Sequence, residues 1–271
     1  MAKLLNIDAN PKTVKGQAHG YMTAILYLAP FSLSDVNLCP TAEIAGCWKT
    51  CLNVQGRGGI PNGNWIHSAG RVAFSVPNNA IQRARLARTR LFNEDQPAFM
   101  DQLTHELAAF VKRAERKGLV PCVRLNGTSD ILWERTGDRD DFTVFANFPS
   151  VQFYDYTKLP ARLRQPLPPN YHLSVSWSGK NGRYQHMAEL AARETGAPLV
   201  GVRHGGWPDA GTHWSMSDLD DIATRAGCRQ VVNGDEHDLR FLDPPHSLVV
   251  LKAKGLARRE SNGFVLGSIA A

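Results

Sequence analysis

Apolar and polar positions follow two periods along this chain, which divide it into helix-sized and strand-sized segments. Helical spacing covers residues 79–92 and 99–117, and Gly118 follows the second segment as a natural C-cap. The same spacing predicts helices over residues 184–195 and 219–226, each followed by a glycine. Short apolar runs predict strands over residues 24–28, 71–76, 120–125, 150–154, 173–177, 198–202, 230–233 and 248–253.

Strands that alternate with helices favour βα units and a parallel sheet. This number of strands suits an α/β fold with a complete or partial (β/α) TIM-like barrel, formed as one domain over residues 1–271. A doubly wound open sheet is the main alternative.

Polar groups follow several predicted strands, and in a barrel the carboxyl ends of the strands form one face that carries the site. These groups could bind a cofactor, or they could form glycine turns capped by side chains. A histidine in such a turn is more often structural than catalytic. The candidate cofactor-binding residues are Asn126, Thr128, Ser129, Asp130, Arg203 and His204.

The composition, with 43% hydrophobic and 21% charged residues, allows a buried core. No apolar stretch is long enough to span a bilayer, and the first twenty residues lack the apolar region of a signal peptide. We therefore expect a protein of the cytoplasm, without membrane partners. The net charge of +6 permits contact with a polyanion without requiring it.

Three of the five cysteines fall in one short window, inside a cysteine-rich loop at residues 37–59. Cys39, Cys47 and Cys51 follow the first predicted strand with the spacing C-x7-C-x3-C. Cys47 and Cys51 are four residues apart, so one helical turn would place both thiols on the same side. Convergent thiolates suit an iron–sulfur cluster, with 4Fe–4S favoured over 3Fe–4S.

Two other interpretations of these three cysteines are possible. They could be buried thiols that act as small hydrophobic residues, or they could bind zinc with His67 as a fourth ligand. Cys122 begins a strand about 13 Å below its carboxyl end, and Cys228 follows a helix. Both positions are poor ones for a fourth ligand to a cluster at the carboxyl ends of the strands.

Basic side chains gather in two places, each of which could contact a phosphate backbone or form an ordinary solvated surface. The first is the predicted helix at residues 79–92, the possible nucleic-acid contact, and the second lies near the C-terminus. The residues are Arg83, Arg85, Arg88 and Arg90, and then Lys252, Lys254, Arg258 and Arg259.

The layout of three cysteines after a first strand resembles that of the radical S-adenosylmethionine enzymes, which have a partial barrel. The spacing departs from their C-x3-C-x2-C pattern, and no clear acidic methionine-binding motif follows the second strand. S-adenosylmethionine is therefore a doubtful cofactor.

A set of short motifs spans nearly the whole chain: Leu33-Ser34, Asn37-Leu-Cys39-Pro, Gly46-Cys47, Cys51-Leu-Asn53, Gly56-Arg57-Gly58, residues 85–92, residues 124–131, residues 154–158 and residues 251–255. In these motifs the chain resembles the phage gene product 88-like family more closely. This resemblance implies a viral origin, hence the host-cell cytoplasm, and a functional cysteine loop, but no reaction. We expect an iron–sulfur protein with its cluster at the mouth of an α/β barrel. The alternative is a non-catalytic nucleic-acid or host-protein binding module with a structural iron–sulfur or zinc site.

Overall fold

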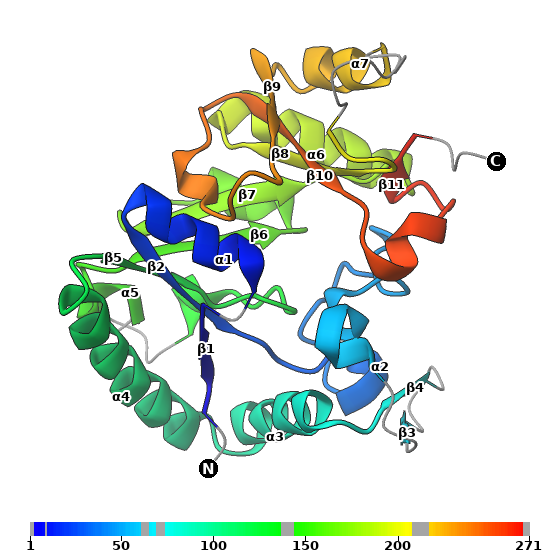
Figure 1. Ribbon diagram of the computed structural model, residues 1–271. Helices are drawn as coiled ribbons and strands as arrows, with labels where there is room; N and C mark the ends of the chain where they lie inside the picture. Colours follow the sequence, from blue (N-terminus) through cyan, green and yellow to red (C-terminus); the bar gives the residue numbers. More distant parts are fainter. Residues whose placement is uncertain are drawn as a thin grey trace. The chain divides into compact units, whose positions relative to one another are not determined.

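The computed structural model describes residues 3–8, 10–60, 65–68, 74–136, 144–207 and 217–267 (Figure 1). Its residues divide into two compact units. The first unit comprises Met1–Pro40 and Cys51–Phe153, and the second comprises Thr41–Thr50 and Tyr154–Ala271. The segment that carries Cys47 therefore belongs to the second unit, whereas Cys39 and Cys51 belong to the first.

The first unit is built on a small sheet in which β2 pairs antiparallel with β1 and parallel with β5, and β5 pairs parallel with β6. A separate antiparallel hairpin joins β3 and β4. Its elements are β1 (Leu5–Ile7), α1 (Pro11–Lys15), η1 (Gly16–His19), β2 (Tyr21–Leu26), α2 (Phe31–Ser34), η2 (Leu52–Val54), η3 (Gly56–Gly59), β3 (Trp65–Ser68), β4 (Phe74–Pro77), α3 (Ala80–Glu94), α4 (Gln96–Glu115), β5 (Val120–Arg124), η4 (Trp133–Arg135), α5 (Val144–Asn147) and the start of β6 (Gln152–Thr157).

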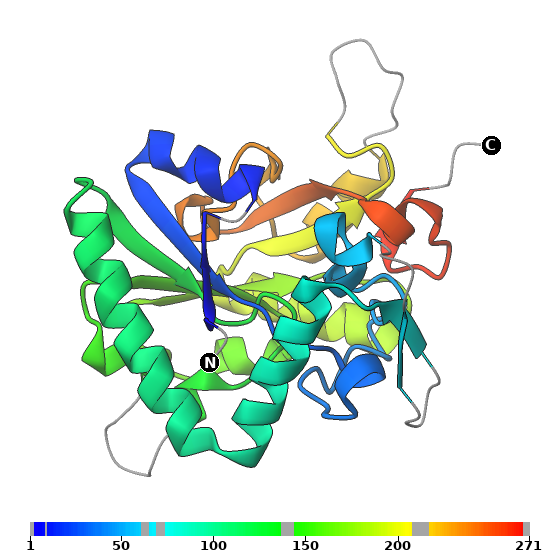
Figure 2. The same cartoon turned by 60° about the horizontal axis from the view of Figure 1, so that its bottom comes forward.

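The two long helices of the first unit begin at side-chain caps. Asn79 accepts hydrogen bonds from the amides of Ile81 and Gln82 at the start of α3, and Asp95 accepts from Ala98 N at the start of α4. Asp95 also ends α3, so the helices meet at a corner, which Figure 2 shows. Phe92 and Phe99 pack across that corner with ring centroids 5.1 Å apart.

In the second unit the strand order is β6-β7-β8-β10-β9, and β7, β8, β10 and β9 are parallel. Helix α6 packs against β7 and β8, and α7 packs against β9 and β10 (Figure 1). Its elements after β6 are η5 (Pro160–Arg164), β7 (Tyr171–Ser176), α6 (Gly182–Thr195), β8 (Leu199–Arg203), α7 (Ser217–Arg225), β9 (Gln230–Asn233), η6 (Arg240–Leu242), β10 (Ser247–Lys252), η7 (Gly255–Arg259) and β11 (Val265–Leu266), which pairs with β8.

The mixed α/β class and the parallel βα units predicted from the sequence are confirmed. The order of paired strands ends at β1 in the first unit and at β9 in the second, and no described ladder joins these two strands. The sheet is therefore not closed, and the predicted TIM-like barrel is not confirmed. The strand predicted at residues 71–76 lies partly outside the described residues, where β4 begins at Phe74.

Candidate functional site: the cysteine-bearing segment

Cys39 lies against the loop that follows β5 in the first unit. Its Sγ is 3.8 Å from the backbone oxygen of Thr128, and the amide of Asp130 donates to Leu38 O at 2.7 Å. The hydroxyl of Thr128 donates to Leu28 O at 2.6 Å, just beyond the end of β2. These contacts fix Cys39 at the carboxyl ends of two parallel strands, β2 and β5.

The loop that holds Cys39 is folded around the buried side chain of Asn126. Its Oδ1 accepts from Ser129 Oγ at 2.8 Å, Ile131 N at 2.9 Å and Trp133 Nε1 at 3.2 Å. Its Nδ2 donates to Ile131 O at 3.0 Å. The side-chain amide of Asn126 therefore forms its hydrogen bonds within its own turn, and the Ser129 hydroxyl donates to it. Both side chains stabilise the loop that contacts Cys39.

Cys51 begins a segment that is fixed to helix α3. Asn53, which is buried, donates to Gln82 Oε1 at 2.9 Å, and Gln82 Nε2 donates to the backbone oxygens of Asn53 and Gly58, both at 2.8 Å. A Cβ at Gly58 would lie 2.7 Å from Asn53 O, so this close turn requires glycine. The sequence motif around Cys51 thus specifies a tightly folded turn.

Arg85 joins this turn as a buried cation. Its Nη1 donates to Asn53 O at 2.6 Å and to Asn53 Oδ1 at 2.8 Å, and its guanidinium lies 4.9 Å from the ring centroid of Tyr27. Burial lowers the pKa of Arg85, while Tyr27 and Cys51 act in the opposite direction. Cys51 therefore lies within electrostatic range of the Arg85 guanidinium.

Cys47 is held by loops of the second unit. The hydroxyl of Ser178, two residues after β7, donates to Ala45 O at 2.7 Å, and Asn262 Nδ2 donates to Gly46 O at 3.0 Å. Gly46 has a φ of +73°, and a Cβ there would lie 2.9 Å from Lys180 Cγ. The turn that presents Cys47 is therefore anchored at the carboxyl end of β7.

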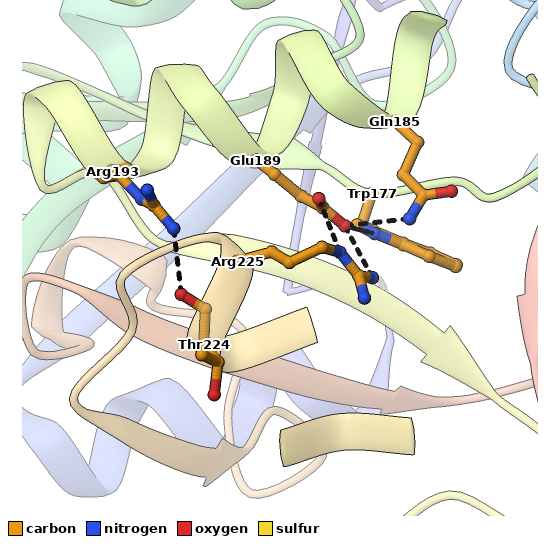
Figure 3. Close-up of polar contacts among 6 residues, drawn as sticks. All are labelled: Trp177, Gln185, Glu189, Arg193, Thr224 and Arg225. Atoms are coloured by element: carbon orange, nitrogen blue, oxygen red, sulfur yellow. Dashed lines mark hydrogen bonds and ion pairs between the residues drawn. The ribbon is translucent and has the colours of Figure 1, made fainter. Parts of the chain in front are cut away.

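Cys47 packs against the apolar cluster that includes Trp177 and Ala45. Figure 3 shows how Trp177 is held: its Nε1 donates to Glu189 Oε1 on α6 at 3.0 Å. Glu189 also accepts from Gln185 at 3.0 Å and, through two hydrogen bonds of 2.9 and 3.0 Å, from Arg225 on α7. We call these four residues, Trp177, Gln185, Glu189 and Arg225, the clamp. It joins α6, α7 and the residue that follows β7.

The hydrogen bonds of this clamp set the ionisation of Glu189. Burial alone would raise the pKa of Glu189, but the hydrogen bonds from Arg225, Trp177 and Gln185 outweigh it, so the pKa lies below its usual value. Arg193, also on α6, donates to Thr224 O at 3.0 Å (Figure 3). The two helices are thus joined at two points along their length.

The remaining two cysteines do not lie in the loops that follow β2, β5 or β7. Cys122 is fully buried within β5, and its Sγ is 3.2 Å from the hydroxyl of Thr23 on β2. Cys228 lies between α7 and β9, where burial and then Glu189 raise its pKa to about 11. Such a thiol stays protonated at neutral pH, which disfavours metal binding.

Arg203 is the last residue of β8, His204 follows it, and both are buried. Arg203 Nη1 donates to Gly206 O at 3.2 Å, and His204 Nε2 is 2.9 Å from Glu260 O. The amide of His204 donates to Leu266 O at 3.0 Å. These contacts join the end of β8 to the turn that precedes β11.

The basic helix predicted at residues 79–92 is only partly a charged surface. Arg85 and Arg88 are buried, whereas Arg83 and Arg90 are exposed. Arg88 donates from Nε to Lys3 O at 2.6 Å, and burial together with Arg85 lowers its pKa to about 10. Two of the four arginines in the predicted basic helix are therefore buried, where they donate hydrogen bonds to backbone oxygens.

In the part of the chain that the structure describes, no group of three or more His, Cys, Asp or Glu side chains has an arrangement that could hold a metal ion. The predicted set of Cys39, Cys47 and Cys51 therefore stays a prediction. Within the described ranges, no helix is long and apolar enough to cross a membrane.

Sequence reasoning missed several of the residues that hold the cysteines. Asn262 lies more than two hundred positions from Gly46, and no local pattern connects them. For Gln82 and Glu189 the sequence pattern predicts only that they lie in helices. The signal that could have found them is a glutamine or glutamate among the small and apolar positions of a helix, which indicates a buried polar contact.

The family model described as Gene product 88 matches residues 3–266. No curated protein and no solved structure matches the chain. The family match agrees with the motifs around the cysteines and supports a bacteriophage origin. Because it covers nearly all of the sequence, the chain belongs to the Gene product 88 family.

Proposed function

We propose that this protein binds an iron–sulfur cluster through the thiolates of Cys39, Cys47 and Cys51, with a 4Fe–4S cluster favoured over 3Fe–4S. The observation that carries the proposal is the placement of the thiols within their own units. Each is partly exposed, Cys39 is fixed at the carboxyl ends of β2 and β5, and Cys47 is fixed at the carboxyl end of β7. The carboxyl ends of parallel strands are where α/β proteins carry their sites.

The donor set suits a soft metal centre. Thiolates select iron–sulfur clusters and zinc over hard cations, and three of them would leave one iron of a cubane for another ligand. Cys122 and Cys228 are disfavoured as that ligand, since the first is buried in the β2–β5 ladder and the second has a raised pKa. A substrate or a non-cysteine side chain is then the candidate fourth ligand.

We also propose that the strands form a partial barrel and that the loops after them border the cofactor. The groups proposed to border the cofactor are Asn126, Thr128, Ser129, Asp130, Arg203 and His204. Their contribution would come from shaping the loops and from backbone groups, because Asn126, Ser129 and His204 hydrogen-bond to other groups of the protein. Such outer contacts orient metal ligands and tune the cluster.

Metal analysis of anaerobically purified protein tests the proposal. We expect a brown protein with iron and acid-labile sulfide, and loss of both when Cys39, Cys47 and Cys51 are replaced by alanine together. Cys228→Ala is the matched control, because it removes one thiol that the proposal does not use. A colourless protein that contains zinc would refute the cluster.

Radical chemistry is a separate part of the proposal and needs its own test. If the fourth iron binds S-adenosylmethionine, the dithionite-reduced protein should cleave it reductively to 5′-deoxyadenosine. Absence of this product from a protein with a full cluster would remove S-adenosylmethionine and leave an iron–sulfur protein of another kind.

A further inference from the structure

Four cationic side chains lie between the last residue of β10 and the end of η7 in the second unit. Lys252, Lys254, Arg258 and Arg259 are all exposed, and we call them the basic surface. Lys252 ends β10, and the two arginines lie in the 3-10 turn η7. Unlike Arg85 and Arg88 of α3, none of the four is buried.

Buried apolar residues fix the backbone of this segment. Ala253, Ala257 and Val265 form one buried cluster, with Val202 and Phe264 packed against it. Ala253 lies between the two lysines, so both side chains project away from that cluster, about 7 Å apart along the strand direction. The apolar side of the segment therefore sets the direction in which the cations point.

Few acidic groups offset these charges. Glu260 is the acidic residue that directly follows, and its Oε1 accepts from Ser261 N and Asn262 N at 3.1 and 3.0 Å, so this carboxylate is folded onto its own turn. Asp235 forms an ion pair with Lys254 at 3.5 Å, in which the lysine side chain is 49% exposed. Four cations against these two carboxylates leave a net positive charge, and the exposed pair of Lys254 with Asp235 is weak and screened by salt.

The basic surface is close in sequence to the contacts that hold the Cys47 turn. Asn262, three residues after Arg259, donates to Gly46 O, and Gly263 O accepts from Gly179 N at 2.9 Å. A ligand on η7 would therefore lie on the segment that anchors this turn. The location connects an electrostatic surface with the proposed site but does not depend on metal binding.

We propose that the basic surface binds the phosphate backbone of nucleic acid. An extended polyanion fits it because the cations occupy both a strand end and a turn, whereas a single phosphate would use one or two of them. An anionic membrane fits less well, because Leu256 is the one large apolar side chain exposed on η7, too little to anchor in lipid. The proposal goes beyond the proposed cluster and stands without it.

Fluorescence anisotropy with a labelled 30-base-pair DNA duplex tests this proposal on the full chain. Each phosphate contact lowers the slope of log affinity against log salt by about 0.9. Arg258→Ala with Arg259→Ala should therefore reduce that slope in magnitude by about 1.8 and weaken binding about 60-fold at 0.1 M salt. The matched control is Arg113→Ala with Arg116→Ala, at the exposed end of α4, which removes the same charge.

The control pair should bind as the unchanged protein does, and circular dichroism should show the same fold for all three. Equal weakening in both pairs would mean that net charge, and not this surface, attracts DNA. Failure of the unchanged protein to bind the duplex, or stronger binding to vesicles of phosphatidylcholine with 30% phosphatidylserine, would also overturn the proposal. The Cys39/Cys47/Cys51→Ala variant should still bind DNA, which separates this surface from the cluster.

Discussion

Replacement of Glu189 by alanine removes the acceptor on which the second unit's clamp is built. Trp177 is 6% exposed, so its indole N–H would be left without a partner, at a cost of about 1–3 kcal/mol. The Arg225 side chain is 46% exposed and would return to water, so loss of its ion pair adds at most about 1 kcal/mol. We therefore expect a destabilisation of about 1–4 kcal/mol.

Urea unfolding followed by far-ultraviolet circular dichroism measures this loss as a shift of the midpoint at unchanged slope. Glu194→Ala is the matched control, because it makes the same substitution on the same helix in an exposed ion pair with Arg164. The control should cost less than about 1 kcal/mol. If both variants lost the same stability, the clamp around Trp177 would contribute nothing of its own, and our reasoning would be wrong.

The same clamp predicts a pH dependence. The pKa of Glu189 is lowered in the folded protein, so its stabilising effect is complete above the usual value of 4.5 and is lost as the pH falls through the folded pKa. The difference in stability between the unchanged protein and Glu189→Ala should therefore shrink below pH 4.5. A difference that stays constant down to pH 3 would contradict the assignment of a charged Glu189.

Three further changes test other buried polar groups. Arg240→Ala should cost about 3–5 kcal/mol in urea unfolding, because Arg240 is fully buried and lies 3.1 Å from the buried carboxylate of Asp243. His172 has a pKa lowered to about 4 by burial and by Arg240, so its replacement by Phe should remove a loss of stability that otherwise develops as the pH falls from 6.5 to about 4. Asn126→Ala should cost about 3 kcal/mol in thermal unfolding, because it leaves Trp133 Nε1 and other groups of its turn without partners.

Most helices and strands could be predicted from the sequence, because the patterns that indicate them are local. The helices at residues 79–92 and 184–195 and the strand at residues 120–125 follow from periodicity and caps, and α3, α6 and β5 lie there. Strand β1 was missed because three residues that pair antiparallel with β2 have no distinct pattern of their own. The closure of a sheet depends on which strands pair, and alternation of strands and helices does not determine that.

The candidate site was predictable in part for the same reason. The clustering of Cys39, Cys47 and Cys51 is visible along the chain, but the residues that hold each cysteine are distant in sequence: Thr128 for Cys39, and Ser178 and Asn262 for the Cys47 turn. Local sequence also gives no sign that the short segment Thr41–Thr50 packs with the second unit, since that follows from long-range contacts alone.

Two of the four arginines of α3 are buried, although the sequence predicts a basic surface for all four. Arg85 and Arg88 satisfy backbone oxygens of Asn53, Lys3 and Tyr27, and a guanidinium with several donors suits such a role. From the sequence, an interior arginine and an exposed one look the same, because the partner oxygens belong to the backbone and carry no residue signature.

Iron and acid-labile sulfide analysis, together with an electron paramagnetic resonance spectrum of the reduced, anaerobically purified protein, tests the central claim most directly. A 4Fe–4S cluster predicts about four iron and four sulfide per chain and a reduced-state signal that disappears in the Cys39/Cys47/Cys51→Ala variant. Protein with zinc or no metal, or a triple variant that retains its iron and its signal, would contradict the claim.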